Sequence, residues 1–351
     1  MDIRSLSWAW AIARRMADSL SALLSTLEIP ATAAALATLA LALRLIVHIG
    51  ATPSGVDTWY YLASADELRR TRRLPISLHQ YILQDRTESY PPGFVIFLAL
   101  LPRAFRESYF PGSTFKVVTA TAALTSGTIT ADEPSYPVRR SYTPPLTNRP
   151  LQNFGGKACG GRLFDVLRVS CNSAFAQMGV DTGPDAMIAT AERFGFNQDV
   201  PIDLTRPARS NFPTDFTRNL PALAQSAIGQ NDVAATPLQM AMVAGAIAND
   251  GTVMTPHVLF DVRDNDGNVV RTYRPKPWTT AMDRGTSALL REAMVGVAER
   301  GTATRLRVPS FTVGGKTGTA QLGTDPARSH AWIIGFAGPP NEAPTIAVAV
   351  I

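Results

Sequence analysis

The residues best suited to chemistry in this 351-residue chain lie in the stretch YFPGSTFKVV, where Ser113 precedes Lys116 by three positions. On a helix this spacing puts the hydroxyl and the amine on one face, one turn apart, where they can form a hydrogen bond. A lysine can accept the proton of a serine nucleophile only when its amine is neutral. Burial and a second nearby cation achieve this by lowering its pKa.

The Ser113–Lys116 spacing alone is not specific, because a serine that caps a helix before a surface lysine has the same spacing. Two further short motifs make the signal specific. RLFDVLRVSCNSAFAQMG places Ser170-Cys171-Asn172 between two segments with helical spacing, and VGGKTGTAQ places Lys316-Thr317-Gly318-Thr319 on a predicted strand. In this order, the three motifs are the signature shared by penicillin-binding proteins and class A β-lactamases.

The sequence around the motifs separates these two classes. FPGSTFK is the transpeptidase form of the first motif, SAIGQNDVAATPLQMA covers residues 226–241, and SHAWIIGFAG follows the third motif. The chain from about Ser108 to Ile351 therefore resembles the transpeptidase domain of class B penicillin-binding proteins, most closely the actinobacterial forms. The resemblance implies an α+β fold of the penicillin-binding transpeptidase and serine β-lactamase type, in which helices pack on an antiparallel sheet.

The resemblance also implies a role for each residue of the first two motifs. Ser113 is the nucleophile that becomes acylated, and Lys116 is its base. Ser170 relays a proton to the leaving amine, and Asn172 holds the amide of the substrate.

The third motif carries the carboxylate site of the family. Lys316 adds the positive charge that keeps Lys116 neutral and attracts the substrate carboxylate, which the hydroxyls of Thr317 and Thr319 bind. Gly318 lets an extended peptide lie against the strand. The backbone N–H groups of Ser113 and Thr319 form the implied oxyanion hole.

The implied reaction is the D,D-transpeptidation of peptidoglycan. A stem peptide ending in D-Ala-D-Ala acylates the serine, releases D-Ala, and passes to the amine of a neighbouring stem peptide. β-Lactams are the implied inhibitors, the membrane and proteins of cell division or elongation are the further partners, and no cofactor is needed. Since this chemistry uses no histidine, we expect His330 to be structural, and Trp332 and Phe336 to belong to the core or the groove wall.

Several elements that must position these motifs can be predicted. TPLQMAMVAGAIAND reads as a helix with Thr236 as N-cap and Pro237 at the first helical position, and TSALLREAMVGVAERG reads as a second core helix that ends at Gly301. FTVGGKTGTA, HAWIIGFAG and PTIAVAVI read as three strands, and the short gaps between them favour antiparallel neighbours. The Pro-rich residues 136–150 read as a loop without chemistry.

The two cysteines, Cys159 and Cys171, have no clustered histidines, so the sequence predicts no metal site. Their spacing alone leaves both a disulfide and two free thiols open, because the outcome depends on the compartment. The resemblance places this domain outside the plasma membrane and so favours a disulfide that braces the active-site loop.

The composition excludes other classes of protein. The net charge is +5, from 33 Lys and Arg against 28 Asp and Glu, and the one tight basic run is at residues 69–73, so no nucleic-acid partner is expected. Charged residues make up 17% and hydrophobic residues 46%, which excludes a disordered chain and favours contact with a membrane or the cell wall.

Near the amino terminus, residues 31–49 read ATAAALATLALALRLIVHI, long enough to cross a hydrocarbon core of about 30 Å. They predict a transmembrane helix, and the alternative is a buried Ala-rich helix. GVDTWYYL at 55–62 and YPPG at 90–93 weakly resemble the start of a multi-span glycosyltransferase for lipid-linked sugars, with Asp57 as base. Without further spans, Asp57 is more simply a solvated carboxylate.

We therefore expect residues 1–105 to be a membrane-anchoring segment of a single-pass protein and residues 106–351 to be its extracytoplasmic transpeptidase domain. The pedestal domain of class B enzymes and the elements before their serine helix are not visible in the sequence. This predicts a domain truncated at both ends, with an incomplete sheet and a fusion near residues 105–108. The alternatives to an active transpeptidase are a catalytically impaired penicillin-binding module with a scaffolding role and a gene-fusion fragment without an independent role.

Overall fold

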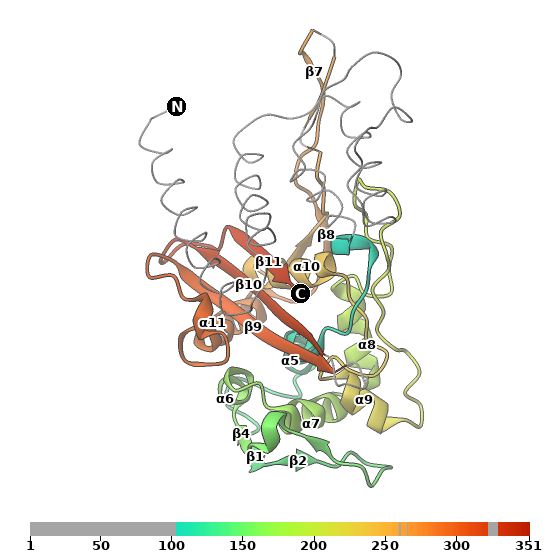
Figure 1. Cartoon of the computed structure of the whole chain (residues 1–351), viewed down its shortest axis with the longest axis vertical. Coiled ribbons are helices and arrows are strands. Elements are labelled where there is room, and N and C mark those ends of the chain that lie inside the picture. Colours follow the sequence, from blue (N-terminus) through green and yellow to red (C-terminus); the bar gives the residue numbers. More distant parts are fainter. Residues whose placement is uncertain (1–102, 260, 265, 322–328) are drawn as a thin grey trace, which may run out of the picture. The chain divides into compact units, whose positions relative to one another are not determined.

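The computed structural model describes residues 103–259, 261–264, 266–321 and 329–351, which Figure 1 shows in colour. All three motifs lie in the unit formed by Ala104–Ile351. The predicted membrane span at 31–49 and Asp57 lie outside the described residues. Within the described ranges, none of the helices is long and apolar enough to cross a bilayer.

The three strands predicted at the carboxyl end form one antiparallel sheet in the order β11-β10-β9. β9 spans Thr312–Gln321, β10 spans Ser329–Gly338 and β11 spans Ile346–Val350. In Figure 1 this sheet is coloured orange to red, and its register sets Trp332 of β10 opposite Gly318 of the third motif. The sheet therefore supports the Lys-Thr-Gly-Thr strand as one of its edges.

Helices make up most of the remaining regular secondary structure in the described residues, so the fold is α+β, as the resemblance implies. They are η1 (Gly112–Phe115), α5 (Lys116–Thr125), η2 (Phe154–Gly156), α6 (Leu163–Arg168), α7 (Asn172–Thr182), α8 (Pro184–Arg193), α9 (Leu220–Ser226), α10 (Pro237–Ala248), α11 (Arg284–Arg300) and η3 (Thr304–Leu306). α10 packs against β10 and β11, and α11 packs against β9.

The remaining strands are short and form pairs. These are β1 (Tyr136–Arg139) with β4 (Cys159–Gly161), β2 (Ser141–Tyr142) with β3 (Leu151–Gln152), β5 (Thr252–Met254) with β8 (Pro277–Thr280), and β6 (Asp261–Arg263) with β7 (Val269–Thr272). The prediction that residues 136–150 are only a loop was wrong, because they contain β1 and β2. Both strands are short and each has a single partner strand, a setting that tolerates a proline such as Pro137.

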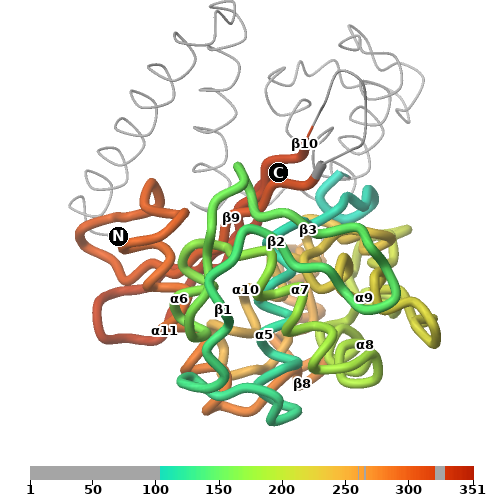
Figure 2. Tube along the Cα trace, turned by 90° about the horizontal axis from the view of Figure 1, so that it is seen from below, coloured from blue at the N-terminus to red at the C-terminus, as the bar shows by residue number. Residues whose placement is uncertain are grey.

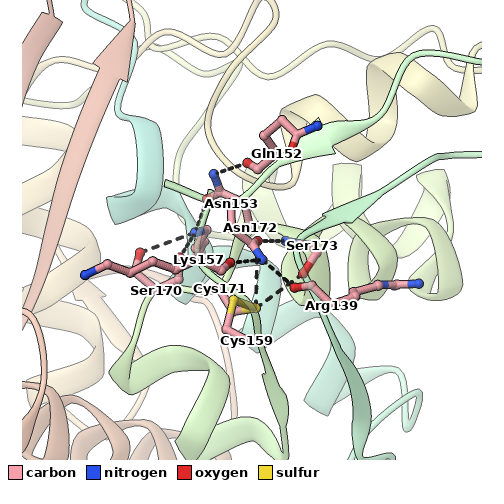
Figure 3. The surroundings of a disulfide bond; sticks show 10 residues. Arg139, Gln152, Asn153, Lys157, Cys159, Ser170, Cys171, Asn172 and Ser173 are labelled. Atoms are coloured by element: carbon pink, nitrogen blue, oxygen red, sulfur yellow. Dashed lines mark hydrogen bonds between the residues drawn. A yellow bond between two sulfur atoms is a disulfide. The ribbon is translucent and has the colours of Figure 1, made fainter. Parts of the chain in front are cut away.

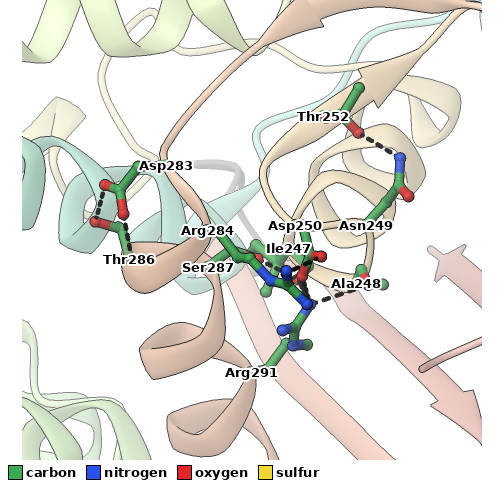
Figure 4. Close-up of polar contacts among 10 residues, drawn as sticks. All are labelled: Ile247, Ala248, Asn249, Asp250, Thr252, Asp283, Arg284, Thr286, Ser287 and Arg291. Carbon is green, nitrogen blue, oxygen red and sulfur yellow. Dashed lines mark hydrogen bonds and ion pairs between the residues drawn. The ribbon is translucent and has the colours of Figure 1, made fainter. Parts of the chain in front are cut away.

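The two predicted core helices are confirmed, and their ends follow from side-chain caps. Thr236 caps α10, since its hydroxyl accepts a 3.0 Å hydrogen bond from the N–H of Gln239. α11 begins before the predicted stretch, at an N-cap formed by Asp283, and is followed by Gly301. Figure 4 shows the joint between the two helices, where the Arg291 guanidinium donates to Asp250 Oδ1 at 2.7 Å and to the carbonyl of Ala248 at 3.2 Å.

A cluster of buried phenylalanines supports the turn that carries the first motif. The ring of Phe115, which is fully buried, stacks on Phe212 with centroids 5.3 Å apart and meets the edge of Phe196 at 5.5 Å. Trp332 and Phe336 are also buried in this core, and the indole N–H of Trp332 donates to the carbonyl of Phe110 at 2.9 Å. The core thus fixes the backbone on both sides of Ser113.

The hydrogen bond at the N-cap of α10 can be tested directly by substitution. Thr236→Val keeps the shape of the buried side chain but removes the acceptor for the Gln239 N–H. We expect the free energy of unfolding of the full-length chain to fall by about 1 kcal/mol in urea titrations. Thr272→Val, on the exposed strand β7, is the matched control. Equal effects of the two substitutions would contradict the capping role.

Candidate active site

The first motif lies on a turn that changes from 3-10 to α-helical geometry. Ser113 is in η1, and Lys116 is the first residue of α5. Ser113 is partly exposed, whereas the Lys116 side chain is fully buried. The expected hydrogen bond between Ser113 Oγ and Lys116 Nζ is not formed, because acceptors of the second motif engage the amine instead.

The second motif surrounds the Lys116 amine with oxygen atoms. Lys116 Nζ donates to the carbonyl of Ser170 at 2.7 Å, to Asn172 Oδ1 at 2.6 Å and, more weakly, to Ser170 Oγ at 3.3 Å. Ser170 lies in the turn between α6 and α7 with a φ of 58°, a left-handed conformation uncommon for residues other than glycine. Its strained backbone allows both its carbonyl and its hydroxyl to reach the same amine.

The third motif brings a second lysine to the same hydroxyl. Lys316 on β9 is fully buried, and its Nζ donates to Ser170 Oγ at 2.8 Å and to the carbonyl of Thr317 at 2.9 Å. Side chains alternate between the two faces of a strand, so Thr317 and Thr319 point away from the face that buries Lys316. The structure thus unites three motifs that are distant in sequence around Ser170 Oγ.

The environment of the two amines favours their neutral forms. Burial lowers the pKa of Lys316 to about 7. Burial, and then the charge of Lys316, hold the pKa of Lys116 well below its ordinary value of 10.5. Among the described residues, no carboxylate forms an ion pair with either lysine. This is the electrostatic condition under which Lys116 can act as a base.

A groove of about 660 Å³ opens over these residues. It is lined by Ser113, Ser170 and Asn172, by residues 317–319 of β9, and by residues 150–155, together with Val169, Gln225, Ile228, Gln230 and Thr302. None of these described lining residues has an ionisable side chain. Lys116 and Lys316 reach these lining residues through their hydrogen bonds to Ser170 and Asn172.

Close backbone contacts hold the serine turn against the strand, and they give Gly318 a role in addition to the predicted one. A Cβ atom on Gly318 would lie 2.9 Å from the carbonyl oxygen of Pro111 and 3.1 Å from the nitrogen of Thr114. The missing side chain therefore makes room for the serine turn of the protein itself. Gly229, at a φ of 72°, likewise leaves no room for a Cβ, which would lie 2.1 Å from the carbonyl oxygen of Gly112.

The oxyanion hole stays a prediction that this packing supports. A Cβ atom on Gly112 would lie 2.8 Å from the carbonyl oxygen of Thr319, so the peptide groups next to Ser113 and Thr319 are close neighbours. The hydroxyl of Thr317 donates to that of Thr302 at 2.6 Å. Sequence reasoning missed Thr302, because it reaches the groove from the loop after α11 and belongs to no motif.

The cysteines and one buried asparagine fix the start of α7, as Figure 3 shows. Cys159 of β4 and Cys171 form a disulfide with Cα atoms 5.8 Å apart. Asn153 accepts from the N–H of Ser173 at 2.8 Å and donates to the carbonyls of Arg139 at 2.7 Å and Lys157 at 2.9 Å. No motif marked Asn153, since two of its three partners, Arg139 and Ser173, are 14 and 20 positions away in the sequence.

The other candidate side chains have structural contacts. Asn172 is already engaged within the protein, because its Oδ1 accepts from Lys116 and its Nδ2 donates to the carbonyl of Gln152 at 2.9 Å. One N–H of that amide remains for a substrate. The ring of His330 meets that of Tyr109 edge-on at 5.1 Å. The described residues contain no group of three or more His, Cys, Asp or Glu side chains that could hold a metal ion.

The α+β fold and the three united motifs place the chain in the class of penicillin-binding proteins and serine β-lactamases. The sequence family "Penicillin binding protein transpeptidase domain" matches residues 79–351. The chain therefore belongs to the penicillin-binding protein transpeptidase family. The match begins upstream of the domain boundary that the sequence predicts at residue 106, and residues 1–78 lie outside it.

Relatives of this chain carry consistent names. It is 39% identical over 263 residues to the peptidoglycan D,D-transpeptidase PbpA of Mycolicibacterium smegmatis, which covers 72% of this chain and 51% of that protein. It is 36% identical over 265 residues to PbpA of Mycobacterium tuberculosis, with the same coverage of 72% and 51%. The chain thus spans about half the length of the curated relatives it matches.

Solved structures agree with these relatives. The imipenem acyl-enzyme complex of penicillin-binding protein A from M. tuberculosis matches with a TM-score of 0.64 and 34% identity, over 74% of this chain and 57% of that chain. The D,D-transpeptidase domain of a peptidoglycan glycosyltransferase from Eggerthella lenta matches with a TM-score of 0.65 and 32% identity, over 70% and 61%.

The contact at Gly318 predicts a kinetic effect. Gly318→Ala pushes β9 away from the serine turn, so we expect the rate constant for acylation by penicillin to fall at least about tenfold. Gly296→Ala is the matched control, because a Cβ atom at this position on α11 meets nothing within 4 Å. A Gly318→Ala rate within twofold of the unaltered chain would show that the contact does not position the serine.

The lowered pKa of Lys316 predicts a pH dependence. Its amine is a charged ammonium below about pH 7 and is neutral above it. The attraction for a ligand carboxylate is therefore lost as the pH rises. We expect stopped-flow acylation by penicillin to slow about tenfold from pH 6.5 to pH 9, equivalent to about 1.4 kcal/mol. In Lys316→Arg the guanidinium stays charged, so this decline should disappear. If the acylation rate still declined with pH in Lys316→Arg, the decline would have to come from the titration of another group.

Proposed function

We propose that this chain carries a peptidoglycan D,D-transpeptidase whose nucleophile is Ser113. The observation that carries the proposal is the arrangement of two buried lysines around Ser170 Oγ beneath the groove that Ser113 lines. The names of its relatives support the same activity. Because this chain spans half their length, the substrates and partners of those whole proteins are carried over as part of the proposal.

In the acylation step, Lys116 takes the proton from Ser113 Oγ. A neutral amine has two hydrogen atoms, which the short contacts to the Ser170 carbonyl and Asn172 Oδ1 use, and a lone pair that is left to accept the proton. Ser113 Oγ then attacks the carbonyl carbon between the two terminal D-Ala residues. The N–H groups of Ser113 and Thr319 stabilise the tetrahedral oxyanion.

The same contacts provide the acid for the leaving group. Ser170 Oγ lies between both lysine amines and can pass a proton from Lys116 to the departing D-Ala nitrogen. The carboxylate of this D-Ala is bound by the hydroxyls of Thr317 and Thr319 and attracted by Lys316. The acyl-serine that remains passes the peptide to the amine of a second stem.

We further propose that residues 106–351 act outside the plasma membrane, anchored by residues 31–49, alongside proteins of cell division or elongation. The disulfide between Cys159 and Cys171 supports an oxidising compartment. A substrate that is part of the cell wall supports the same location.

The decisive experiment is labelling of the purified full-length chain with a fluorescent penicillin, followed by mass mapping of the adduct. We expect one adduct on Ser113, and a loss of labelling of at least about a hundredfold in Ser113→Ala, because this variant lacks the proposed nucleophile. Ser126→Ala, an exposed serine just after α5, is the matched control. A folded chain without an adduct would overturn the proposal and favour a catalytically impaired penicillin-binding module.

A further inference from the structure

One wall of the groove consists of residues that the acylation mechanism does not use. Residues 150–155 follow the Pro-rich segment and line the groove in one continuous stretch. Its apolar side chains include Leu151 and Phe154, and Phe154 is 76% exposed. An aromatic ring left exposed at the rim of a site is free to pack against a ligand.

This wall is joined directly to the second motif. The carbonyl of Gln152 on β3 accepts from Asn172 Nδ2 at 2.9 Å, as Figure 3 shows, and Asn172 in turn accepts from Lys116. β3 is two residues long, and this contact with Asn172 uses its Gln152 carbonyl, so β3 contributes to the wall but offers no free backbone edge. Figure 2 shows the β2–β3 hairpin beside α7, which both strands contact.

In the described residues the groove therefore has a free strand edge on β9 and, facing it, the wall formed by residues 150–155. An extended peptide binds such an edge by adding a strand to it. Transpeptidation needs two peptides, a donor that becomes the acyl group and an acceptor that supplies an amine. The proposed function places the donor carboxylate on β9, which leaves the wall at residues 150–155 for a second chain.

The relation between the two chemical steps also favours placing the acceptor at this wall. Attack by the acceptor amine is the reverse of the departure of the D-Ala amine, so the acceptor must enter beside the group that relayed the proton, Ser170. The amine nitrogen forms a bond to the ester carbon, the bond from that carbon to Ser113 Oγ breaks, and the proton of the amine returns to Ser113 Oγ through Ser170 and Lys116. The 150–155 wall is connected to this side of the groove through Asn172.

We propose that residues 150–155 form the subsite for the acyl acceptor, an extended peptide with a free amine, and that Phe154 packs against its chain. This inference rests on the proposed transpeptidase function. None of the described residues that line the groove is ionisable, so the inferred contact with the acceptor is apolar packing on Leu151 and Phe154.

The test measures how the acyl-enzyme divides between aminolysis and hydrolysis. The full-length chain is acylated by a benzoyl-D-alanyl thioester, and products are separated with D-alanine or a stem tripeptide bearing a side-chain amine as acceptor. In Phe154→Ala we expect the aminolysis-to-hydrolysis ratio to fall at least about fivefold for the tripeptide and less than twofold for D-alanine, which is too small to reach the wall. Phe154→Tyr should retain the ratio. Val138→Ala, whose side chain is 74% exposed on β1 away from the groove lining, is the matched control.

An unchanged tripeptide ratio in Phe154→Ala would overturn the acceptor subsite, as would an equal fall for both acceptors, which would place the effect on the chemical step. A fall in Val138→Ala of the same size would also overturn it. Failure of the proposed function is seen separately, because the unaltered chain would then form no adduct on Ser113 with penicillin.

Discussion

Two lysine amines buried side by side around one serine hydroxyl are the constraint on which the rest of this domain depends. Charges are costly to bury, and among the described residues neither Lys116 nor Lys316 has a carboxylate to compensate its charge. The fold instead provides neutral acceptors, chiefly the carbonyls of Ser170 and Thr317 and the amide oxygen of Asn172. The domain accepts a loss of stability here in return for an amine that can accept a proton near neutral pH.

This arrangement requires three distant segments to meet within hydrogen-bonding distance. The phenylalanine cluster beneath Phe115 fixes the serine turn, and the sheet fixes the strand of Lys316. The disulfide at Cys171 and the hydrogen bonds of Asn153 fix the first turn of α7 between them. The residues that hold the site together are therefore largely distinct from those proposed to carry out the reaction.

The sequence was sufficient to predict what depends on short spacing. The serine helix, the cap at Thr236 and the three carboxyl-terminal strands follow from local patterns, the α+β class follows from the family resemblance, and the structure confirms them. Contacts across long separations could not be predicted in this way. Lys116 bonds to the second motif instead of to Ser113, and the space at Gly318 is filled by the backbone near Pro111, because both depend on how distant elements pack.

The close packing of backbone at Gly318 and Gly229 also limits how resistance to β-lactams can arise. A substitution at either glycine would displace the serine turn itself and would impair the natural reaction together with the reaction of the drug. Exposed lining side chains such as Phe154 can be replaced without a clash against the backbone of the serine turn. Selection by antibiotics can therefore act on the rim of the groove, while its floor is closed to variation.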